Sequence, residues 1–355
     1  MSWAANAADR KEWNFIETET ADVRRLQRSC SASLLTIVAL GACGPSALSQ
    51  AAPPSLVLEN TIPLPDVKGR IDHLAADPEH KRLFVAELEN GTVETIDLAT
   101  GKVAGRIVGL REPQGLGYLP ESNELVVASG DGTVRFFRAA DLSPLVEIKL
   151  SDDADNVRID PMTGLVVVGY GNGALAIIDP ATHSVSNTIA LSAHPESFRI
   201  DAAGRRAFVN LPGAGQVAVA DLVTMRVTST RAAGYAANYP MMFDPASKGL
   251  AVAYRLPARL VISEADDGRV RQDVDTCGDS DDLFLDAKRQ RIYVSCGSGD
   301  IDVFQAVAEG YKRSVRIKTR SGARTSLFVP ELDRLYVAAR AGNGKPGAIL
   351  VFRPE

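Results

Sequence analysis

The stretch HLAADPEHKRLFVAELENGTVETIDLATGKVAGRIV, residues 73–108, decides the fold of this chain. Short apolar and β-branched runs alternate in it with turn residues at Asp77-Pro78, Asn90-Gly91 and Thr100-Gly101. β-Branched and aromatic residues favour strands, whereas Asp-Pro and Gly-containing pairs favour turns. The stretch therefore predicts four short antiparallel strands joined by tight turns.

The same pattern recurs along the chain. Copies anchored on their first turns are separated by 43, 40, 41, 43, 42 and 44 residues. The anchors are Asp77, Pro120, Asp160, Asp201, Asp244, Asp286 and Pro330. A period of about 40–45 residues with four short strands per unit is typical of a β-propeller. We therefore predict an all-β fold over residues 53–355, a seven-bladed β-propeller with four-stranded blades.

The seventh copy lacks a fourth strand, because the chain ends after its third strand near Phe352. Residues 56–62, LVLENTI, precede the first copy and have the composition of a strand. We expect this N-terminal strand to pair with residues 349–352 as the outermost strand of the last blade. Such pairing closes the ring and covers an exposed sheet edge.

The repeats RLFVAELENGTVETIDLATGKV, RIYVSCGSGDIDVF and RLYVAARA resemble the YVTN-type, YncE-like β-propeller family. The resemblance covers residues 56–355 and implies the propeller fold. It implies no single function, because that superfamily includes binding proteins and lactonase-like enzymes, and it offers no catalytic motif to carry over. Function has to be argued from the site.

Residues 1–52 differ from the repeats and resemble a secretory signal. Arg24, Arg25 and Arg28 precede the apolar run 34–42, which is too short to span a bilayer, and small residues follow. Residues 1–22 make a poor signal start, so we hypothesise a natural start near Val23. We expect export to the periplasm or outer cell envelope.

Two exits from this segment remain open. Leu40-Gly41-Ala42-Cys43 resembles a lipobox, which would place a lipid on Cys43 and tether the protein to a membrane. Ser49-Gln50-Ala51 fits ordinary cleavage before a soluble protein.

Beyond residue 52 the chain has two cysteines, Cys277 and Cys296. They lie on either side of the turn at Asp286, which joins the first two predicted strands of one copy. Antiparallel strands about that turn bring them to the same face, and an oxidising compartment favours a disulfide between them. No Cys-x-x-Cys-His motif occurs, which excludes covalent c-type haem.

A net charge of −5, with no dense basic run after residue 30, disfavours nucleic acid as a partner. We expect a monomer that binds a small molecule, a cation or a protein at its central face.

The candidate site lies where the first strands begin, because equivalent positions of a propeller converge on its axis. Five residues before the anchor, four copies carry acids: Asp72, Asp155, Glu196 and Asp281. Polar residues beside this position complete the predicted ligand-binding set, which is His73, Gln114, Asn156, His194, Asn238, Asp282 and Arg324. The opposite face has repetitive turn residues, which indicate a structural role alone.

Two interpretations of these acids compete. Each can accept backbone hydrogen bonds and join loops. Together, clustered carboxylates would favour a cationic guest, a divalent metal ion or an amine, unless Arg158, Arg199 and Arg324 supply the counter-charge.

Three functional classes follow from the sequence. The first is an exported propeller that binds a ligand or partner without demonstrable catalysis. The second is a metal-assisted enzyme of lactonase or lyase type, and the third is a haem-binding propeller resembling the cytochrome d1 type, with His73 or His194 as axial ligand.

Overall fold

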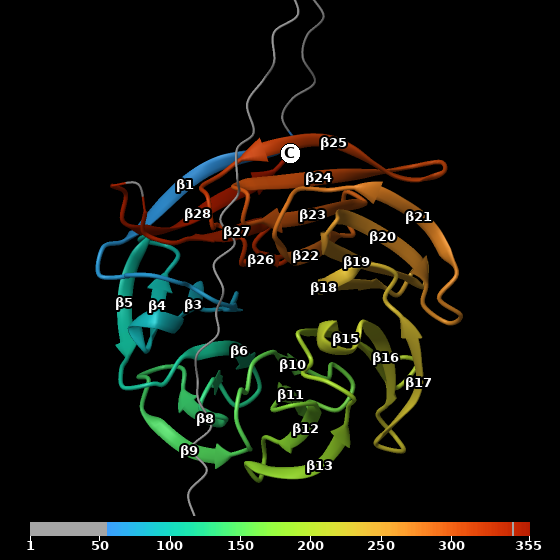
Figure 1. Cartoon of the computed structure of the whole chain (residues 1–355). Coiled ribbons are helices and arrows are strands. Elements are labelled where there is room, and N and C mark those ends of the chain that lie inside the picture. Colours follow the sequence, from blue (N-terminus) through green and yellow to red (C-terminus); the bar gives the residue numbers. More distant parts are fainter. Residues whose placement is uncertain (1–54, 343) are drawn as a thin grey trace, which may run out of the picture. The chain divides into compact units, whose positions relative to one another are not determined.

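The computed structural model describes residues 55–342 and 344–355, which form a ring of seven four-stranded antiparallel sheets (Figure 1). The predicted seven-bladed propeller is confirmed. The expected signal segment, with Cys43 and the two alternative exits, lies outside the described residues. No helix in the described part of the chain is long and apolar enough to cross a membrane.

Blades 1 to 6 run outward from the axis in chain order, so the first strand of each is innermost and the fourth outermost. Blade 1 consists of β2 (Leu74–Asp77), β3 (Arg82–Glu87), β4 (Thr92–Asp97) and β5 (Lys102–Ile107). Blade 2 consists of β6 (Pro113–Leu119), β7 (Glu124–Ser129), β8 (Thr133–Arg138) and β9 (Pro144–Lys149). Blade 3 consists of β10 (Val157–Ile159), β11 (Val166–Tyr170), β12 (Ala174–Asp179) and β13 (Ser184–Ala190).

The remaining blades follow the same order. Blade 4 consists of β14 (Ser197–Asp201), β15 (Arg206–Leu211), β16 (Gln216–Asp221) and β17 (Arg226–Ala232). Blade 5 consists of β18 (Ala236–Asp244), β19 (Gly249–Leu256), β20 (Ala258–Glu264) and β21 (Val270–Asp275). Blade 6 consists of β22 (Ser280–Asp286), β23 (Arg291–Cys296), β24 (Asp300–Val307) and β25 (Gly310–Lys318). Two short 3₁₀ helices, η1 (Leu88–Asn90) and η2 (Pro212–Ala214), lie in second-to-third turns.

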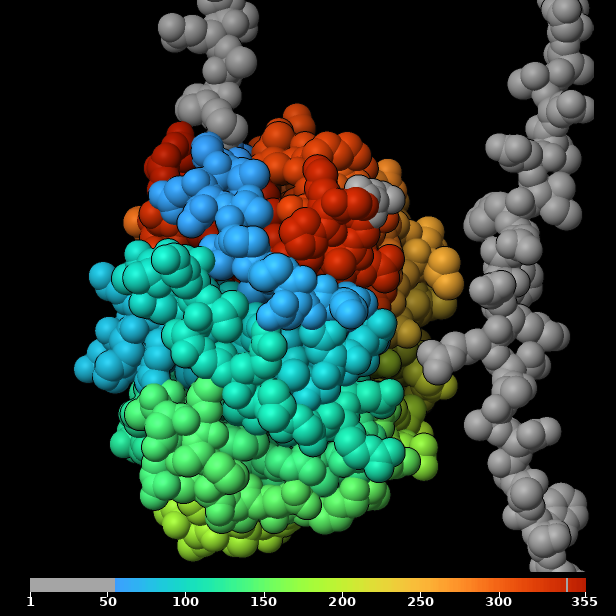
Figure 2. All heavy atoms as spheres, turned by 90° about the vertical axis from the view of Figure 1, so that its left-hand side faces the viewer, coloured from blue at the N-terminus to red at the C-terminus, as the bar shows by residue number. Residues whose placement is uncertain are grey.

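Blade 7 joins the two ends of the propeller. It combines β26 (Ser326–Val329), β27 (Arg334–Ala339) and β28 (Gly347–Pro354) with β1 (Leu56–Leu64) as the outermost strand. β1 is antiparallel to β28, with Ile62 opposite Ile349 and Leu58 opposite Phe352. In the space-filling view the blue N-terminal strand lies between the red C-terminal residues and the cyan residues of blade 1 (Figure 2).

The first-to-second-strand turns are held by the aspartates that open them. The Asp77 carboxylate accepts a backbone hydrogen bond from His80 at 3.1 Å, and Asp201 and Asp286 accept equivalent bonds from Gly204 and Arg289. These aspartates therefore have the structural role that the repeated turn residues indicate.

The core lies between neighbouring blades, where the apolar faces of their sheets meet. β3 is almost wholly buried, whereas most residues of β5 in the same blade are exposed. Cys277 and Cys296 are joined by a disulfide in blade 6, with Cα atoms 5.9 Å apart, and both side chains are buried.

Two buried glutamates of blade 1, Glu87 and Glu94, project from the same face of adjacent strands. Their exposed fractions are 0% and 1%. Arg106 Nε donates to Glu94 Oε1 at 2.9 Å, whereas Glu87 accepts from the Thr92 hydroxyl and its Oε1 has no hydrogen-bond partner among the described residues. Burial, with the nearby Glu94 charge, raises the pKa of Glu87 to about 8. The structure thus keeps Glu87 protonated at neutral pH.

This shift predicts a loss of stability as the pH rises. The native Glu87 holds a proton that the unfolded chain releases above its ordinary pKa of 4.5, so unfolding becomes easier between about pH 5 and pH 8. One pKa unit corresponds to about 1.4 kcal/mol, so a loss of a few kcal/mol is expected. Glu87→Gln should reduce the fall in melting temperature across this range. The exposed control Glu121→Gln should leave the fall unchanged, and equal slopes in both variants would contradict the assignment.

Candidate functional site

Two cavities lie along the axis, lined largely by the first strands β2, β6, β10, β14, β18, β22 and β26 and the residues that precede them. We call the side where these strands begin the loop face, and the side with the turns at the seven anchors the turn face. The polar cavity lies at the loop face. The wide cavity begins at the turn face and extends inward to the polar cavity. His73 and Asp282 line both cavities.

The polar cavity contains all four acids that occupy the equivalent repeat position. Its lining residues are Arg70, Asp72, His73, Asp155, Asn156, Glu196, Ser197, Tyr239, Asp281 and Asp282. This is the convergence that the repeat positions predict. Its volume is about 20 Å³, and one water molecule needs roughly 10–15 Å³. The polar cavity therefore has room for a water molecule or a small ion but not for an organic guest.

Arginines pair with Asp281, the blade 6 acid at the equivalent repeat position, and with the nearby Asp279. Arg324 Nε lies 3.1 Å from Asp281 Oδ2, and Arg255 contacts Asp281 and also lies 3.2 Å from Asp279 Oδ1. The Arg255 guanidinium stacks on the Tyr239 ring, 3.7 Å from its centroid. Arg324 is thus a counter-charge, as one of the two interpretations requires, and a cationic guest has less repulsion to relieve here.

The remaining acids are less completely paired. Asp72 lies 2.7 Å from Arg70 Nη2, and burial raises its pKa. Among the described residues, Asp155 and Glu196 have no arginine or lysine nitrogen within 4.0 Å. Burial raises the pKa of Asp155 well above its usual value, and burial also raises that of Glu196. His73 Nε2 lies 3.6 Å from Asp155 Oδ1, which has no hydrogen-bond partner in the described structure.

Four of the predicted ligand-binding residues, Gln114, His194, Asn238 and Arg324, do not line the polar cavity. Arg324 instead lines a separate pocket with Arg70 and Asp279. Gln114 donates to the Asp153 side chain at 3.0 Å, and His194 lies 2.7 Å from the Gly171 carbonyl. Asn238 is fully buried and donates to Asn210 Oδ1 at 3.2 Å and to the Gln216 carbonyl at 3.0 Å. Asn238 therefore joins blades 4 and 5, which corrects its predicted role as a ligand residue.

Asn156 and Asp282 lie in the cavity but are also held by the fold. Asn156 donates to the Glu196 carbonyl at 2.5 Å, and the Ser326 backbone N–H donates to Asp282 Oδ2 at 2.7 Å. Within residues 55–342 and 344–355, no three His, Cys, Asp or Glu side chains are arranged to hold a metal ion. The described residues thus offer no three-residue site of the kind that the metal-assisted class would use.

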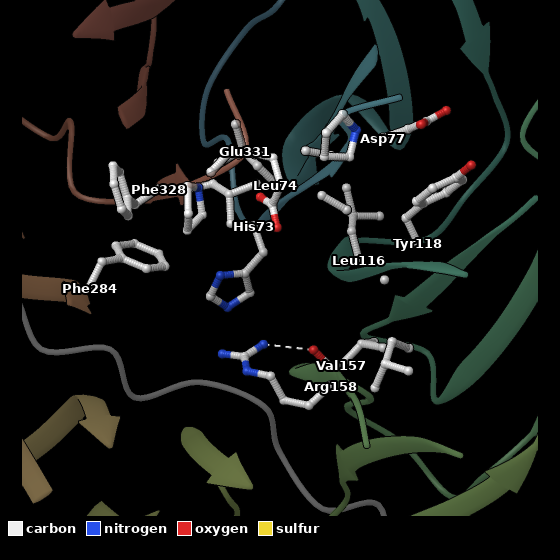
Figure 3. A pocket seen from close by; sticks show the side chains of 18 of the residues that line it. His73, Leu74, Asp77, Leu116, Tyr118, Val157, Arg158, Phe284, Phe328 and Glu331 are labelled. Carbon is white, nitrogen blue, oxygen red and sulfur yellow. Dashed lines mark hydrogen bonds between the residues drawn. The ribbon is translucent and has the colours of Figure 1, made fainter. Parts of the chain in front are cut away.

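The wide cavity has a volume of about 540 Å³, within the usual range of small-molecule sites. Its walls include Leu116, Tyr118, Val157, Phe284 and Phe328 (Figure 3). His73 and Arg158 face the interior beside one another at its inner end (Figure 3), and Arg199 and Asp282 line the same cavity. The larger cavity thus opens at the face where the sequence indicated structural turns alone.

Charge is unevenly distributed at the inner end of the wide cavity. Burial, with the nearby Arg158 charge, lowers the pKa of His73 to about 3, so this ring is neutral at pH 7. Burial and the charge of Asp281 raise the pKa of Asp282 to about 8. Burial, with the charge of Arg158, lowers the pKa of Arg199 to about 9, which leaves it protonated at neutral pH. The inner end is therefore positively charged.

The repeat alignment contains a signal for these arginines that our sequence analysis did not use. Arg158 and Arg199 both lie two residues before their anchors, and Tyr118, Phe284 and Phe328 occupy the same position in other blades. At this repeat position two neighbouring blades carry arginine, whereas the other blades carry apolar or aromatic residues. This difference could have indicated a charged group inside the channel.

Comparisons with known proteins support the fold. No family model matches the chain, and no curated protein matches it. The Kuenenia stuttgartiensis hydrazine synthase contains a similar chain, with a TM-score of 0.70 and 18% identity over 81% of this chain and 97% of that one. A chain in a crystal structure of the mitotic checkpoint complex has a TM-score of 0.72 and 14% identity over 90% and 98%. These similarities establish the propeller fold alone.

Proposed function

We propose that this protein binds a small organic molecule in its central channel, through the wide cavity, and that it is related to YVTN-type propellers. The observation that carries the proposal is an axial cavity of about 540 Å³ with apolar walls and a polar inner end. Ligand sites typically combine a mostly apolar lining with a few polar groups that orient the guest. The polar cavity at the loop face, which the sequence favoured, is too small for this purpose.

The proposed compartment is the periplasm or outer envelope, on the strength of the signal-like residues 24–52. Binding without catalysis is our proposal for this cavity, because burial and nearby arginines lower the pKa of His73 to about 3, which makes its ring a weak base. The geometry of the wide cavity supports this proposal, whereas the similar solved structures support the fold alone.

Filling the cavity tests this function. Ala75 lies two residues before its anchor, where other blades carry Tyr118, Phe284 and Phe328, so the backbone geometry at this position accommodates an aromatic side chain. Ala75→Phe should abolish binding of guests in the cavity. Saturation-transfer NMR with naphthylethanol, naphthylethylamine and naphthylacetate should show at least one of these probes binding to the wild type and lost in the variant.

The control is Val223→Phe, at a position that is 67% exposed. It adds the same aromatic side chain to the surface and should bind the probes as the wild type does. The proposed function fails if none of the three probes binds to the wild type, or if Ala75→Phe binds them unchanged.

A further inference from the structure

We propose that the guest of the wide cavity is an organic anion whose carboxylate is held by Arg158 and Arg199, with its apolar body against the aromatic walls. This inference rests on the proposed function and adds the chemical class of the ligand. The sequence analysis favoured a cationic guest at the loop face, so the inference differs from it in both the charge of the guest and its site.

The guanidinium groups of Arg158 and Arg199 donate hydrogen bonds to neutral acceptors. Arg158 donates to its neighbours, the Val157 carbonyl at 2.7 Å and Asn156 Oδ1 at 2.9 Å. Arg199 donates to the Phe198 carbonyl at 3.1 Å and the Leu283 carbonyl at 3.5 Å. Among the described residues, neither guanidinium has a carboxylate oxygen within 4.0 Å. Both cations are therefore oriented by neutral acceptors and have no close counter-ion from the protein.

The two arginine charges are energetically unfavourable in the empty cavity. A charge removed from water without a counter-ion is destabilising, and natural proteins pair such charges or use them for binding. Here the two positive groups repel one another, because the charge of Arg158 contributes to the lowered pKa of Arg199. A bound carboxylate would relieve this repulsion. Guanidinium groups suit that ligand because their planar N–H donors match the two oxygens of a carboxylate.

The neighbouring side chains of Asp282 and His73 supply little negative charge to the two arginines. Asp282 is the carboxyl group whose charge acts on both arginines, but burial and Asp281 raise its pKa to about 8, which leaves it largely protonated at neutral pH. The neutral His73 ring adds no negative charge. The arginine pair thus keeps its net positive charge, and protonated Asp282 can itself donate a hydrogen bond to an anion.

The wide cavity has apolar walls in front of the two arginines. Phe284 and Phe328 lie on one side and Leu116 and Tyr118 on another, which surrounds the space in front of the arginine pair with apolar surface (Figure 3). The outer end at the turn face is acidic, with the exposed Glu79 and Glu331. A guest with an anionic head and an apolar body therefore finds its complementary charge only at the inner end.

Titration calorimetry with the same three naphthyl probes tests the ligand class. Naphthylacetate should bind the wild type at least tenfold more tightly than naphthylethanol and naphthylethylamine. Arg199→Gln and Arg158→Gln should each weaken naphthylacetate binding by about tenfold to a hundredfold, as expected for a charge-assisted hydrogen bond. Without ligand, both variants should melt at or above the wild-type temperature, because a half-buried charge that repels the other arginine has been removed.

The matched control is Arg231→Gln. Arg231 also donates to backbone carbonyls, those of Glu264 and Ala265, and burial also lowers its pKa, but it lies outside the channel. It should bind naphthylacetate as the wild type does. The comparison of probes on the wild type does not depend on any variant folding.

Each outcome separates the two proposals. Equal or tighter binding of naphthylethanol or naphthylethylamine would overturn the anion assignment and leave the proposed function standing. Unchanged naphthylacetate binding in both channel variants would also overturn it. Absence of binding by all three probes would instead remove the proposed function itself.

Discussion

Deletion of residues 55–64 is expected to leave no stable folded monomer. These residues contain β1, which supplies the outermost strand of blade 7 and pairs with β28 from Leu56 opposite Pro354 to Leu64 opposite Gly347. Without them the ring has no strand joining its first and last parts, and the backbone groups of β28 form an open edge. Open edges promote aggregation, so the variant should be insoluble or oligomeric by size-exclusion chromatography.

The packing of β1 shows why the effect should be large. Leu56 packs into the apolar cluster between blades 6 and 7, whereas Ile62 and Leu64 pack into the cluster between blades 7 and 1. Truncation of one such buried side chain costs about 2–5 kcal/mol, and whole domains are stable by about 5–15 kcal/mol. Loss of all three, together with the strand pairing, should exceed the stability of the fold.

A pair of point variants separates packing from the loss of chain. Ile62 is 2% exposed and Leu58 is 51% exposed, although both lie in β1. Ile62→Ala should lower the free energy of unfolding by about 2–5 kcal/mol, whereas Leu58→Ala should change it by less than about 0.5 kcal/mol. Similar effects of the two substitutions, or a deletion variant that melts as the wild type does, would show that β1 does not close the ring.

Reduction of the disulfide should give the second large effect. Cys277 and Cys296 are separated by 19 residues, for which the chain-entropy model gives about 3 kcal/mol of stabilisation. In a protein of this size that corresponds to a fall in melting temperature of roughly 3–6 °C. Differential scanning calorimetry with and without reductant measures it.

The double variant Cys277→Ala/Cys296→Ala supplies the control. It should melt below the oxidised wild type and should not respond to reductant, because it has no bond to lose. Both side chains are buried, so a part of its destabilisation comes from lost packing, and the reduced wild type isolates the effect of the bond. The oxidised wild type should contain no titratable thiol at these two positions after denaturation, and two free thiols there would contradict the assignment.

The fold was predictable because the repeat encodes it locally. Each blade is formed from contiguous residues, and the turn chemistry that separates its strands recurs at Asp77, Asp160, Asp201, Asp244 and Asp286. The strand count also implied the closure, because a seventh blade with only three strands needs a fourth from elsewhere. These are short-range properties, and no knowledge of side-chain packing between blades was required.

The candidate site was predictable only in part. Residues at equivalent repeat positions lie at the same level along the propeller axis. The sequence therefore correctly placed four acids in one cavity, namely Asp72, Asp155, Glu196 and Asp281. It did not show that the cavity has a volume of only about 20 Å³. The free space at an axis depends on the side chains of all blades at once, and those volumes are combined only by the ring.

Charge balance likewise needed the tertiary structure. Arg255 belongs to blade 5 and Asp281 to blade 6, 26 residues apart, yet their side chains are ion-paired. Conversely, Arg158 and Arg199 have acids close by in the sequence but no carboxylate within 4.0 Å in the described structure. Long flexible side chains choose partners across blade boundaries, and sequence spacing does not specify that choice.

The sequence by itself thus determined the number of blades, the order of their strands and the convergence of the four equivalent acids on the axis. The tertiary structure alone decided which of those residues are neutralised, where open space remains and which charges face it. The physical reason is that strand and turn formation depend on neighbouring residues, whereas desolvation and cavity volume depend on all seven blades together.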